Sequence, residues 1–385
     1  MTQEANIDEK YKQVGHVISS AGGTPVPVND TLVKLLKYFL GEEDLDFVLA
    51  FREHKSQTLD QLKETTGLSE SGVVEKANKL ASRGVIFNQP NRKGTMVYRL
   101  LPLLNVGTFE YMFMGKIEHN ERNRQISALF DQLFEELEDI VQSNYDSLMP
   151  QLMQAPPVDR TVPMAENKST GQPIKIMVDE SVEESADRIL PAQQVEALIE
   201  KFDEIALGYC FCRHHKDLSG QPCKQTDLRE TCFTFGKSAR YTSEQGFSRM
   251  ISKQEAREIL KRSEADGLVH KAYHPNFDIS KDETSVCNCC RCCCGNSVEN
   301  MIAPISNATN FLAVIDPDLC VGCGTCVDEC HTYAAYLGDD GKAQRNEELC
   351  IGCGVCAAFC PENAISMVKG PTRIVRIAPK KKKAL

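Results

Sequence analysis

The sequence predicts an α+β chain of several domains. Three observations carry this prediction: the length of 385 residues, the confinement of all 18 cysteines to the span Cys210–Cys360, and a cysteine pattern that occurs twice near the C-terminus. A chain of this length has room for about two or three domains. Its 42% hydrophobic and 25% charged residues are ordinary globular values, which excludes a wholly disordered chain.

Shifts in composition divide the chain into segments. Prolines and small polar residues between Gln154 and Pro173 are typical of a linker. We expect, in order, an N-terminal extension (1–29), a domain of helices and short strands (30–107), a helical segment (108–153), a linker (154–173), a cysteine-rich metal-binding domain (174–305), a duplicated domain (306–371) and a basic tail (372–385).

The cysteine-free half indicates three helices followed by a two-stranded wing between Asp30 and Pro102. Thr58 and Gln61 have the spacing of a capping box. Apolar residues at helical spacing predict a helix over 71–83, and strands are expected at 85–87 and 96–98 around a turn at 91–94. This order resembles a winged helix-turn-helix domain, which implies either DNA binding or protein docking.

Charge favours protein docking. Residues 30–99 hold 11 Lys and Arg against 10 Asp and Glu, and the whole chain has a formal net charge of −10. A DNA-binding domain normally carries a basic face, because phosphate contacts dominate its affinity. Nucleic acid is therefore the less favoured partner. A helix over 122–143 follows, with a wide apolar stripe that we expect to pack on its own domain; a dimer or partner interface is the alternative.

The strongest pattern is the duplicated run C-x2-C-x2-C-x3-C. The first run is Cys320, Cys323, Cys326 and Cys330, and each cysteine recurs 30 positions later as Cys350, Cys353, Cys356 and Cys360. The runs resemble those of bacterial two-[4Fe–4S] ferredoxins, over 310–369. The resemblance implies a (βαβ)2 fold and two cubane clusters in which the fourth cysteine of each run ligates the other cluster. One ligand set is then Cys320, Cys323, Cys326 and Cys360, and the other is Cys350, Cys353, Cys356 and Cys330.

Two details of the runs matter for this interpretation. The proline that follows the last cysteine in such ferredoxins is present as Pro361, whereas the first run has His331 at that place. We expect this difference to affect a turn and not a ligand. A zinc or disulfide framework is the disfavoured alternative, because zinc sites pair two C-x2-C units.

Ten further cysteines precede the runs. They are Cys210, Cys212, Cys223, Cys232, Cys287, Cys289, Cys290, Cys292, Cys293 and Cys294. The C-x-C-R-H and CNCC-x-CCC patterns within them are similar to a region of poorly characterised iron–sulfur proteins of anaerobes. We expect at least one further iron–sulfur centre here, with reversible dithiol chemistry as the alternative. Which thiols are ligands, and whether the centre is a cubane, a non-cubane cluster or zinc, stays open. Nearby histidines (His214, His215, His270, His274) are expected to form hydrogen bonds or to face solvent, and not to ligate.

Function follows from these centres. We expect an electron-transfer protein, a subunit or partner of a larger anaerobic oxidoreductase, that relays electrons through two clusters to or from the further centre. A redox-responsive winged-helix DNA-binding regulator and a self-contained reductase are the alternatives. No phosphate-binding motif occurs, so no NAD or ATP site is expected.

Partners and location follow from charge and hydropathy. Residues 316–369 carry nine acidic and three basic residues, which favours a positively charged redox partner. The basic tail is expected to be solvated, with peripheral contact to an anionic membrane or nucleic acid as the alternative. Neither a signal peptide nor a transmembrane run is present, so a cytoplasmic location is expected.

Overall fold

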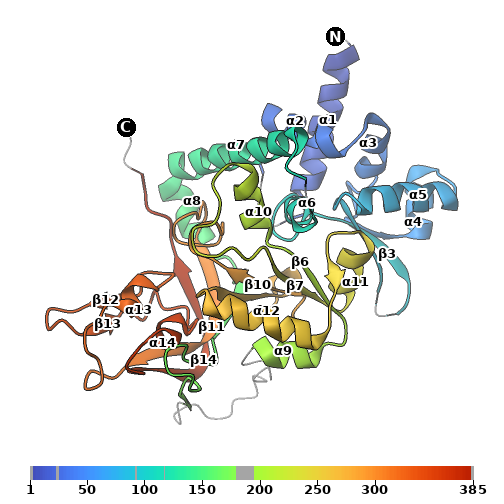
Figure 1. Ribbon diagram of the computed structural model, residues 1–385. Helices are drawn as coiled ribbons and strands as arrows, with labels where there is room; N and C mark the ends of the chain where they lie inside the picture. The colour runs from blue at the N-terminus through green and yellow to red at the C-terminus, as the bar shows by residue number, and fades with distance from the viewer. Residues whose placement is uncertain (1–2, 23–25, 92, 117, 179–194, 383–385) are drawn as a thin grey trace. The chain divides into compact units, whose positions relative to one another are not determined.

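The computed structural model describes residues 3–22, 26–91, 93–116, 118–178 and 195–382 (Figure 1). These residues form two compact units. Unit 1 comprises 1–140, 208–222 and 239–249, and unit 2 comprises 141–207, 223–238 and 250–385. Arg92 in the expected turn, and Lys383 in the expected basic tail, lie outside the described residues.

Unit 1 is mainly helical. Its helices are α1 (Gln3–Ser19), α2 (Asp30–Phe39), α3 (Glu42–Leu49), α4 (Leu59–Thr66), α5 (Glu70–Ala81), α6 (Thr108–Met114), α10 (Phe211–Leu218) and most of α7 (Glu121–Ser143). A small antiparallel sheet has the strand order β1 (Ser56–Thr58), β3 (Met96–Leu100), β2 (Ile86–Pro90). One apolar core joins these elements, and it includes buried residues of α1, which lies in the segment expected to be an N-terminal extension.

Local sequence explains the helix boundaries in unit 1. Thr58 and Gln61 form the expected reciprocal capping box at the start of α4, and Gly67 ends that helix with a left-handed φ of 68°. Ser69 caps α5, whose Val73, Ala77 and Leu80 are fully buried. The described residues between Asp30 and Pro102 form four helices and three strands, where the sequence predicted three helices and two strands. Its identity as a winged-helix domain stays a prediction.

Unit 2 is organised by one nine-stranded sheet. Its order is β5 (Ile176–Val178), β14 (Ile365–Ile377), β11 (Ile305–Ile315), β4 (Asp159–Val162), β9 (Val269–Tyr273), β10 (Ser285–Cys289), β7 (Glu230–Phe235), β6 (Ile205–Tyr209) and β8 (Arg249–Met250). Helices α9 (Val195–Lys201) and α12 (Lys253–Ala265) pack on the strands from β4 to β6 through a core that includes Leu198, Phe233, Leu260 and Val286. The remaining elements are α8 (Tyr145–Leu152), α11 (Lys237–Glu244), which begins in unit 2, and the 3-10 helix Pro275–Phe277.

The C-terminal part of unit 2 has the expected duplicated order of elements. Strand β11 leads to α13 (Thr325–Asp328) and β12 (Ala335–Leu337), and then β13 (Ala343–Arg345) leads to α14 (Val355–Ala358) and β14. The long first and last strands of this part, β11 and β14, pair antiparallel from Ile305 with Ile377 to Ile315 with Ile365. The short strands β12 and β13 form a separate hairpin.

Three expected boundaries differ from the structure. The expected linker contains β4, which pairs with both β9 and β11 inside the sheet. The expected cysteine-rich domain is divided, because 208–222 and 239–249 belong to unit 1. The expected basic tail begins inside β14, and beyond it Pro379 accepts a hydrogen bond from Tyr145 while Lys381 pairs with Asp146. In each case distant strand or helix partners, which local composition does not reveal, determine the structure.

A buried ion pair lies where β4 meets β9. The fully buried Asp159 carboxylate lies 3.3 Å from the Lys271 ammonium, and the side-chain amides of Asn296 and Asn307 also donate to it. Desolvation raises the pKa of Asp159. Removing one member of such a pair is costly, because the other charge is left buried without a counter-ion.

We therefore expect Asp159→Asn to destabilise the protein by about 3–5 kcal/mol, because it leaves the Lys271 charge uncompensated. The matched control is Asp146→Asn, which breaks the exposed pair with Lys381 and should cost less than about 1 kcal/mol. Urea unfolding followed by far-UV circular dichroism measures both. Equal effects of the two substitutions would show that the buried pair contributes nothing beyond a surface one.

Candidate metal centres

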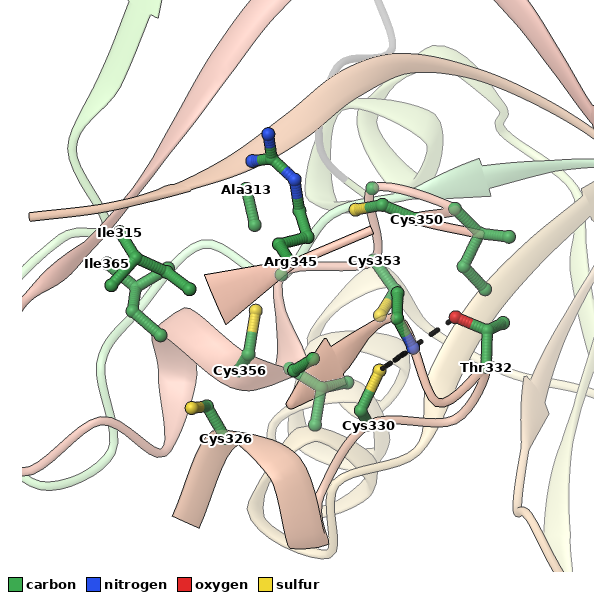
Figure 2. A pocket seen from close by; sticks show the side chains of 16 residues that line it. Ala313, Ile315, Cys326, Cys330, Thr332, Arg345, Cys350, Cys353, Cys356 and Ile365 are labelled. Carbon is green, nitrogen blue, oxygen red and sulfur yellow. Dashed lines mark hydrogen bonds between the residues drawn. The ribbon is translucent and has the colours of Figure 1, made fainter. Parts of the chain in front are cut away.

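Two cavities in unit 2 collect the cysteines of the duplicated runs. Cys320, Cys323, Cys326 and Cys360 line the first cavity. Cys330, Cys350, Cys353 and Cys356 line the second, which Cys326 also reaches (Figure 2). The fourth cysteine of each run thus lies at the cavity of the other run.

The sequence repeat is also a repeat of backbone geometry. Gly322 and Gly324 have φ values of 73° and 80°, and their counterparts Gly352 and Gly354 have 65° and 75°. Even the rare left-handed non-glycine residues correspond, at Tyr333 and Asn363. The two runs therefore fold alike, each turning three cysteines toward one cavity.

Backbone N–H groups point at the sulfur atoms. Ala334 donates to Cys330 Sγ at 3.2 Å, and its counterpart Ala364 donates to Cys360 Sγ at 3.3 Å. Ala343 donates to Cys320 Sγ at 3.4 Å. Hydrogen bonds to cluster-ligating sulfurs are one of the means by which a protein sets the reduction potential of an iron–sulfur cluster.

The two cavities differ in the exposure of single thiols. Cys323 is exposed, and Leu319 and Val321 beside it expose 52% and 65% of their surface. At the second cavity, burial raises the pKa of Cys353 to about 12 and that of Cys356 well above its ordinary value. Metal ions bind the thiolate form, so filling the second cavity must release protons from buried thiols.

Residues that the sequence analysis missed support both cavities. Met164 N–H donates to Cys353 O, and the buried Asn167 side chain donates to the carbonyl oxygens of Ala357 and Cys360 at 2.8 and 2.9 Å. Lys342 donates to Cys320 O, and Arg373 donates to Cys350 O. No local signal marks them, because each acts through a backbone carbonyl of a distant segment.

Four of the remaining ten cysteines form a compact set, which we call the tetrathiol group: Cys223, Cys290, Cys292 and Cys293. Their Sγ atoms all lie within 4.8 Å of one another. Hydrogen bonding with Cys290, and the N–H of Lys224, lower the pKa of Cys292 to about 6. Among the described residues it is the single set of three or more possible metal-ligating side chains that lie this close together.

A second set, the trithiol group, comprises Cys287, Cys289 and Cys294. Cys289 hydrogen-bonds with both others, and these bonds, together with burial, raise its pKa well above the ordinary value. Cys287 and Cys289 alternate along β10 with Val286, which faces the apolar core. Cys232 alternates in the same way with Phe233 on β7, and Val286 pairs with Phe233, so Cys232 belongs to the same sheet face as Cys287 and Cys289.

Cys210 and Cys212 lie in unit 1, at the N-terminal end of α10. The nearby histidines are buried and bonded to oxygen, as expected. Their partners are Phe113 O for His214, Ser127 O for His215, Asn288 Oδ1 for His270 and Lys281 O for His274.

His331, which stands where the second run has Pro361, has a specific contact. Its imidazole is buried and Nε2 lies 3.0 Å from Gly267 O. Burial lowers its pKa to about 4, so the ring is neutral at physiological pH. The residue at this position therefore joins the first run to the segment that follows α12, which the corresponding Pro361 cannot do because proline has no polar side-chain atom.

Comparison with known proteins agrees with this geometry. The family model of the 4Fe-4S dicluster domain matches residues 313–367. The C-terminal part of the chain is a 4Fe–4S dicluster ferredoxin domain, and a domain of this kind supports iron–sulfur electron transfer.

Two curated relatives each match a short stretch of the chain. The chain is 51% identical to a probable ferredoxin of Methanosarcina thermophila over 37 residues, which are 10% of this chain and 64% of that protein. It is 41% identical to a ferredoxin of Pyrobaculum islandicum over 59 residues, 15% of this chain and 55% of that protein. The chain thus spans less than two thirds of the length of each. No solved structure matches it. Within the part of the chain that the structure describes, no helix is long and apolar enough to cross a membrane.

We expect Gly352→Ala to lower the iron bound per chain. A Cβ atom at Gly352 would lie 2.3 Å from Phe311 O, a backbone atom of β11 that cannot move without breaking the sheet. The control is Gly171→Ala, which has nearly the same φ, 67° against 65°, but nothing within 4 Å of the added atom. Both variants are purified anaerobically and their iron content is measured. The comparison separates the effect of the steric clash at residue 352 from that of a positive φ at an alanine. The prediction is wrong if the two variants retain the same iron.

Proposed function

We propose that this protein is an iron–sulfur electron-transfer protein that holds two [4Fe–4S] clusters. The first is ligated by Cys320, Cys323, Cys326 and Cys360, and the second by Cys350, Cys353, Cys356 and Cys330. The observation that carries this proposal is that three thiols of one run and the last thiol of the other meet at each cavity, with Cys326 reaching the second cavity as well. Two neighbouring clusters form a relay, whereas a sensor needs a single labile one.

The partner is an electron-transfer subunit or a separate protein of a larger oxidoreductase, and it docks at the first cavity. Three features support this site: the exposed Cys323, the exposed apolar side chains of Leu319 and Val321, and the exposed carboxylates of Asp318 and Asp339. An apolar centre with an acidic border suits a partner with a positively charged face, because opposite charges steer the encounter.

The other end of the relay is the cysteine-rich part of unit 2. The second cluster takes its fourth ligand from Cys330, next to His331, whose imidazole contacts Gly267 O. The trithiol group, together with Cys232 on the same sheet face, is the candidate for the further redox centre that exchanges electrons with the second cluster. Burial of its neighbour Lys271 lowers the pKa of that ammonium, but the charges of Asp159, Cys289 and Cys294 outweigh this and raise the pKa overall. A positive charge beside the trithiol group stabilises the thiolate form of its cysteines.

The N-terminal helical region serves protein docking in this proposal, not DNA binding. The basic residues of α5 already have partners within unit 1. Lys76 donates to Glu43 O, while Lys79 pairs with Glu43 and Asp44. Arg83, just beyond α5, pairs with the fully buried Asp44 carboxylate. Binding phosphates would break these contacts, which weakens the case for a regulator.

The ligand assignment is tested by a matched pair of variants. We expect Cys330→Ala to remove the second cluster and Cys360→Ala to remove the first, because the fourth thiolates are exchanged between the runs. The measurement is alkylation of the folded protein followed by mass spectrometry, since cluster-bound thiols are protected.

In Cys330→Ala the thiols of Cys350, Cys353 and Cys356 should become reactive, and those of Cys320, Cys323 and Cys326 should stay protected. Cys360→Ala should give the reverse pattern. Loss of protection within the mutated run instead would contradict the crossed assignment, and eight unprotected thiols in the unsubstituted protein would overturn the cluster proposal itself.

The docking site is tested through charge. Asp318 and Glu348 precede the first cysteine of each run by two residues, and both are exposed. We expect Asp318→Lys to slow oxidation of the reduced protein by hexaammineruthenium(III), a cation, by about three- to tenfold at low salt. The control Glu348→Lys should have a smaller effect, because it adjoins the second cavity, which has no exposed thiol. Stopped-flow absorbance measures both rates. Equal slowing by the two variants, or slowing that persists at about 1 M salt, where the Debye length is only about 3 Å, would contradict the assignment.

A further inference from the structure

The tetrathiol group brings together two segments that are far apart in the sequence. Cys223 lies in the loop between α10 and β7, and Cys290, Cys292 and Cys293 lie in the turn directly after β10. Cys290 and Cys293 are buried, and the other two are half-buried. Two of the four cysteines are therefore shielded from solvent, and two are partly accessible.

The spacing of the sulfur atoms matches one ion. Cys223 Sγ lies 3.5 Å from Cys292 Sγ, which lies 3.7 Å from Cys293 Sγ. Four thiolates at about 2.3 Å from a tetrahedral zinc ion lie about 3.8 Å from one another. A disulfide does not account for the set, because its two sulfur atoms lie about 2.05 Å apart and it joins two thiols, not four.

The duplicated runs provide an internal comparison. In a cubane cluster each thiolate binds a different iron, so the four sulfur atoms must stand farther apart than around a single ion. The eight thiols line the two cavities, and none of them belongs to a close group like the tetrathiol group within the described chain. The distances between sulfur atoms are thus shorter in the tetrathiol group than among the thiols at the two cavities.

Backbone donors favour thiolates here. Lys224 N–H donates to Cys292 Sγ at 3.4 Å, and the N–H groups of Gln225 and Thr226 donate to Cys223. Three successive N–H groups directed at two sulfur atoms stabilise negative charge on sulfur. A thiolate is the form in which cysteine ligates a metal.

We propose that Cys223, Cys290, Cys292 and Cys293 hold a single tetrahedral metal ion, Zn²⁺ or a lone iron, and not an iron–sulfur cluster. All four positions are filled by thiolates, so no position is open for a substrate, and the site is structural in class. This proposal goes beyond electron transfer and does not depend on it.

The ion would fix the loop that docks on the dicluster domain. Gln225, two residues after Cys223, accepts from Arg291 N–H and donates to the carbonyl oxygens of Asp266 and Gly267. Gly267 O is also the partner of His331. Arg291, between two of the ligands, donates to Asp328 O in α13. Without the ion the thiols would bind protons again, and the metal–sulfur bonds that join Cys223 to the turn after β10 would be lost.

The test compares metal content and metal environment in full-length protein purified anaerobically. Cys293→Ser removes one ligand, and the control Cys289→Ser makes the same change in the adjacent trithiol group. We expect Cys293→Ser to lose one metal ion per chain with no loss of acid-labile sulfide, and Cys289→Ser to retain that ion. Acid-labile sulfide measures iron–sulfur clusters and not a single metal ion. Failure of the ferredoxin-cluster proposal and failure of the single-ion proposal therefore give different results.

X-ray absorption of the unsubstituted protein needs no variant and covers the case in which Cys293→Ser does not fold. A zinc edge with four sulfur neighbours at about 2.3 Å and no metal neighbour supports a zinc site. If no zinc is bound, iron in excess of acid-labile sulfide that Cys293→Ser removes supports a lone iron. Loss of iron and sulfide together in Cys293→Ser would overturn the proposal in favour of a cluster. Thiols that carry no metal and form disulfides on mild oxidation would overturn it in favour of dithiol chemistry.

Discussion

The left-handed backbone at the glycines of the two cysteine runs is the constraint on which unit 2 depends. Three cysteines separated by two residues can face one cavity only if the chain turns sharply between them. At Gly352 the turn brings the backbone so close to Phe311 O that no Cβ fits, and at Gly354 the neighbour is the backbone of Met164. Strand β11 and the segment that contains Met164 thus lie against the second run. This contact fixes the place of β11, and of its neighbour β4, in the sheet.

The spacing between thiols, more than their number, decides what each group of cysteines can hold. At each cavity three thiols of one segment meet a fourth from the other. The CNCC-x-CCC motif begins on β10 and continues into the turn that follows it, so its thiols are divided between the strand and the turn. Cys287 and Cys289 share one sheet face, whereas Cys290, Cys292 and Cys293 turn toward Cys223. One short motif therefore serves two groups, which explains its high density of cysteines.

Sequence predicted features that depend on neighbours in the chain. The capping box at Thr58, the helix now observed as Glu121–Ser143 and the repeat of the cysteine runs are of this kind. It did not predict β4, since its four residues include Asp159 and Arg160 and its partners lie more than 100 positions away. The supporting role of Asn167 was equally invisible, because a side-chain amide bonded to a distant carbonyl leaves no pattern. Composition indicated a linker where the fold has a central strand.

The two halves of the repeat differ at a few positions, and these differences distinguish one end of the dicluster domain from the other. Both runs share their glycines, their helical turns and their N–H to sulfur bonds, so the ligand sets are nearly equivalent. They diverge at Pro361, which is exposed, and at His331, which is buried against Gly267 O. They also diverge at Cys323, which is exposed, whereas its counterpart Cys353 is not. His331 therefore ties the first run to the cysteine-rich part of unit 2, and Cys323 gives that run an exposed thiol. Two clusters with equivalent surroundings could exchange electrons at either end, and in the function proposed above these differences make the Cys323 end the one that meets a partner.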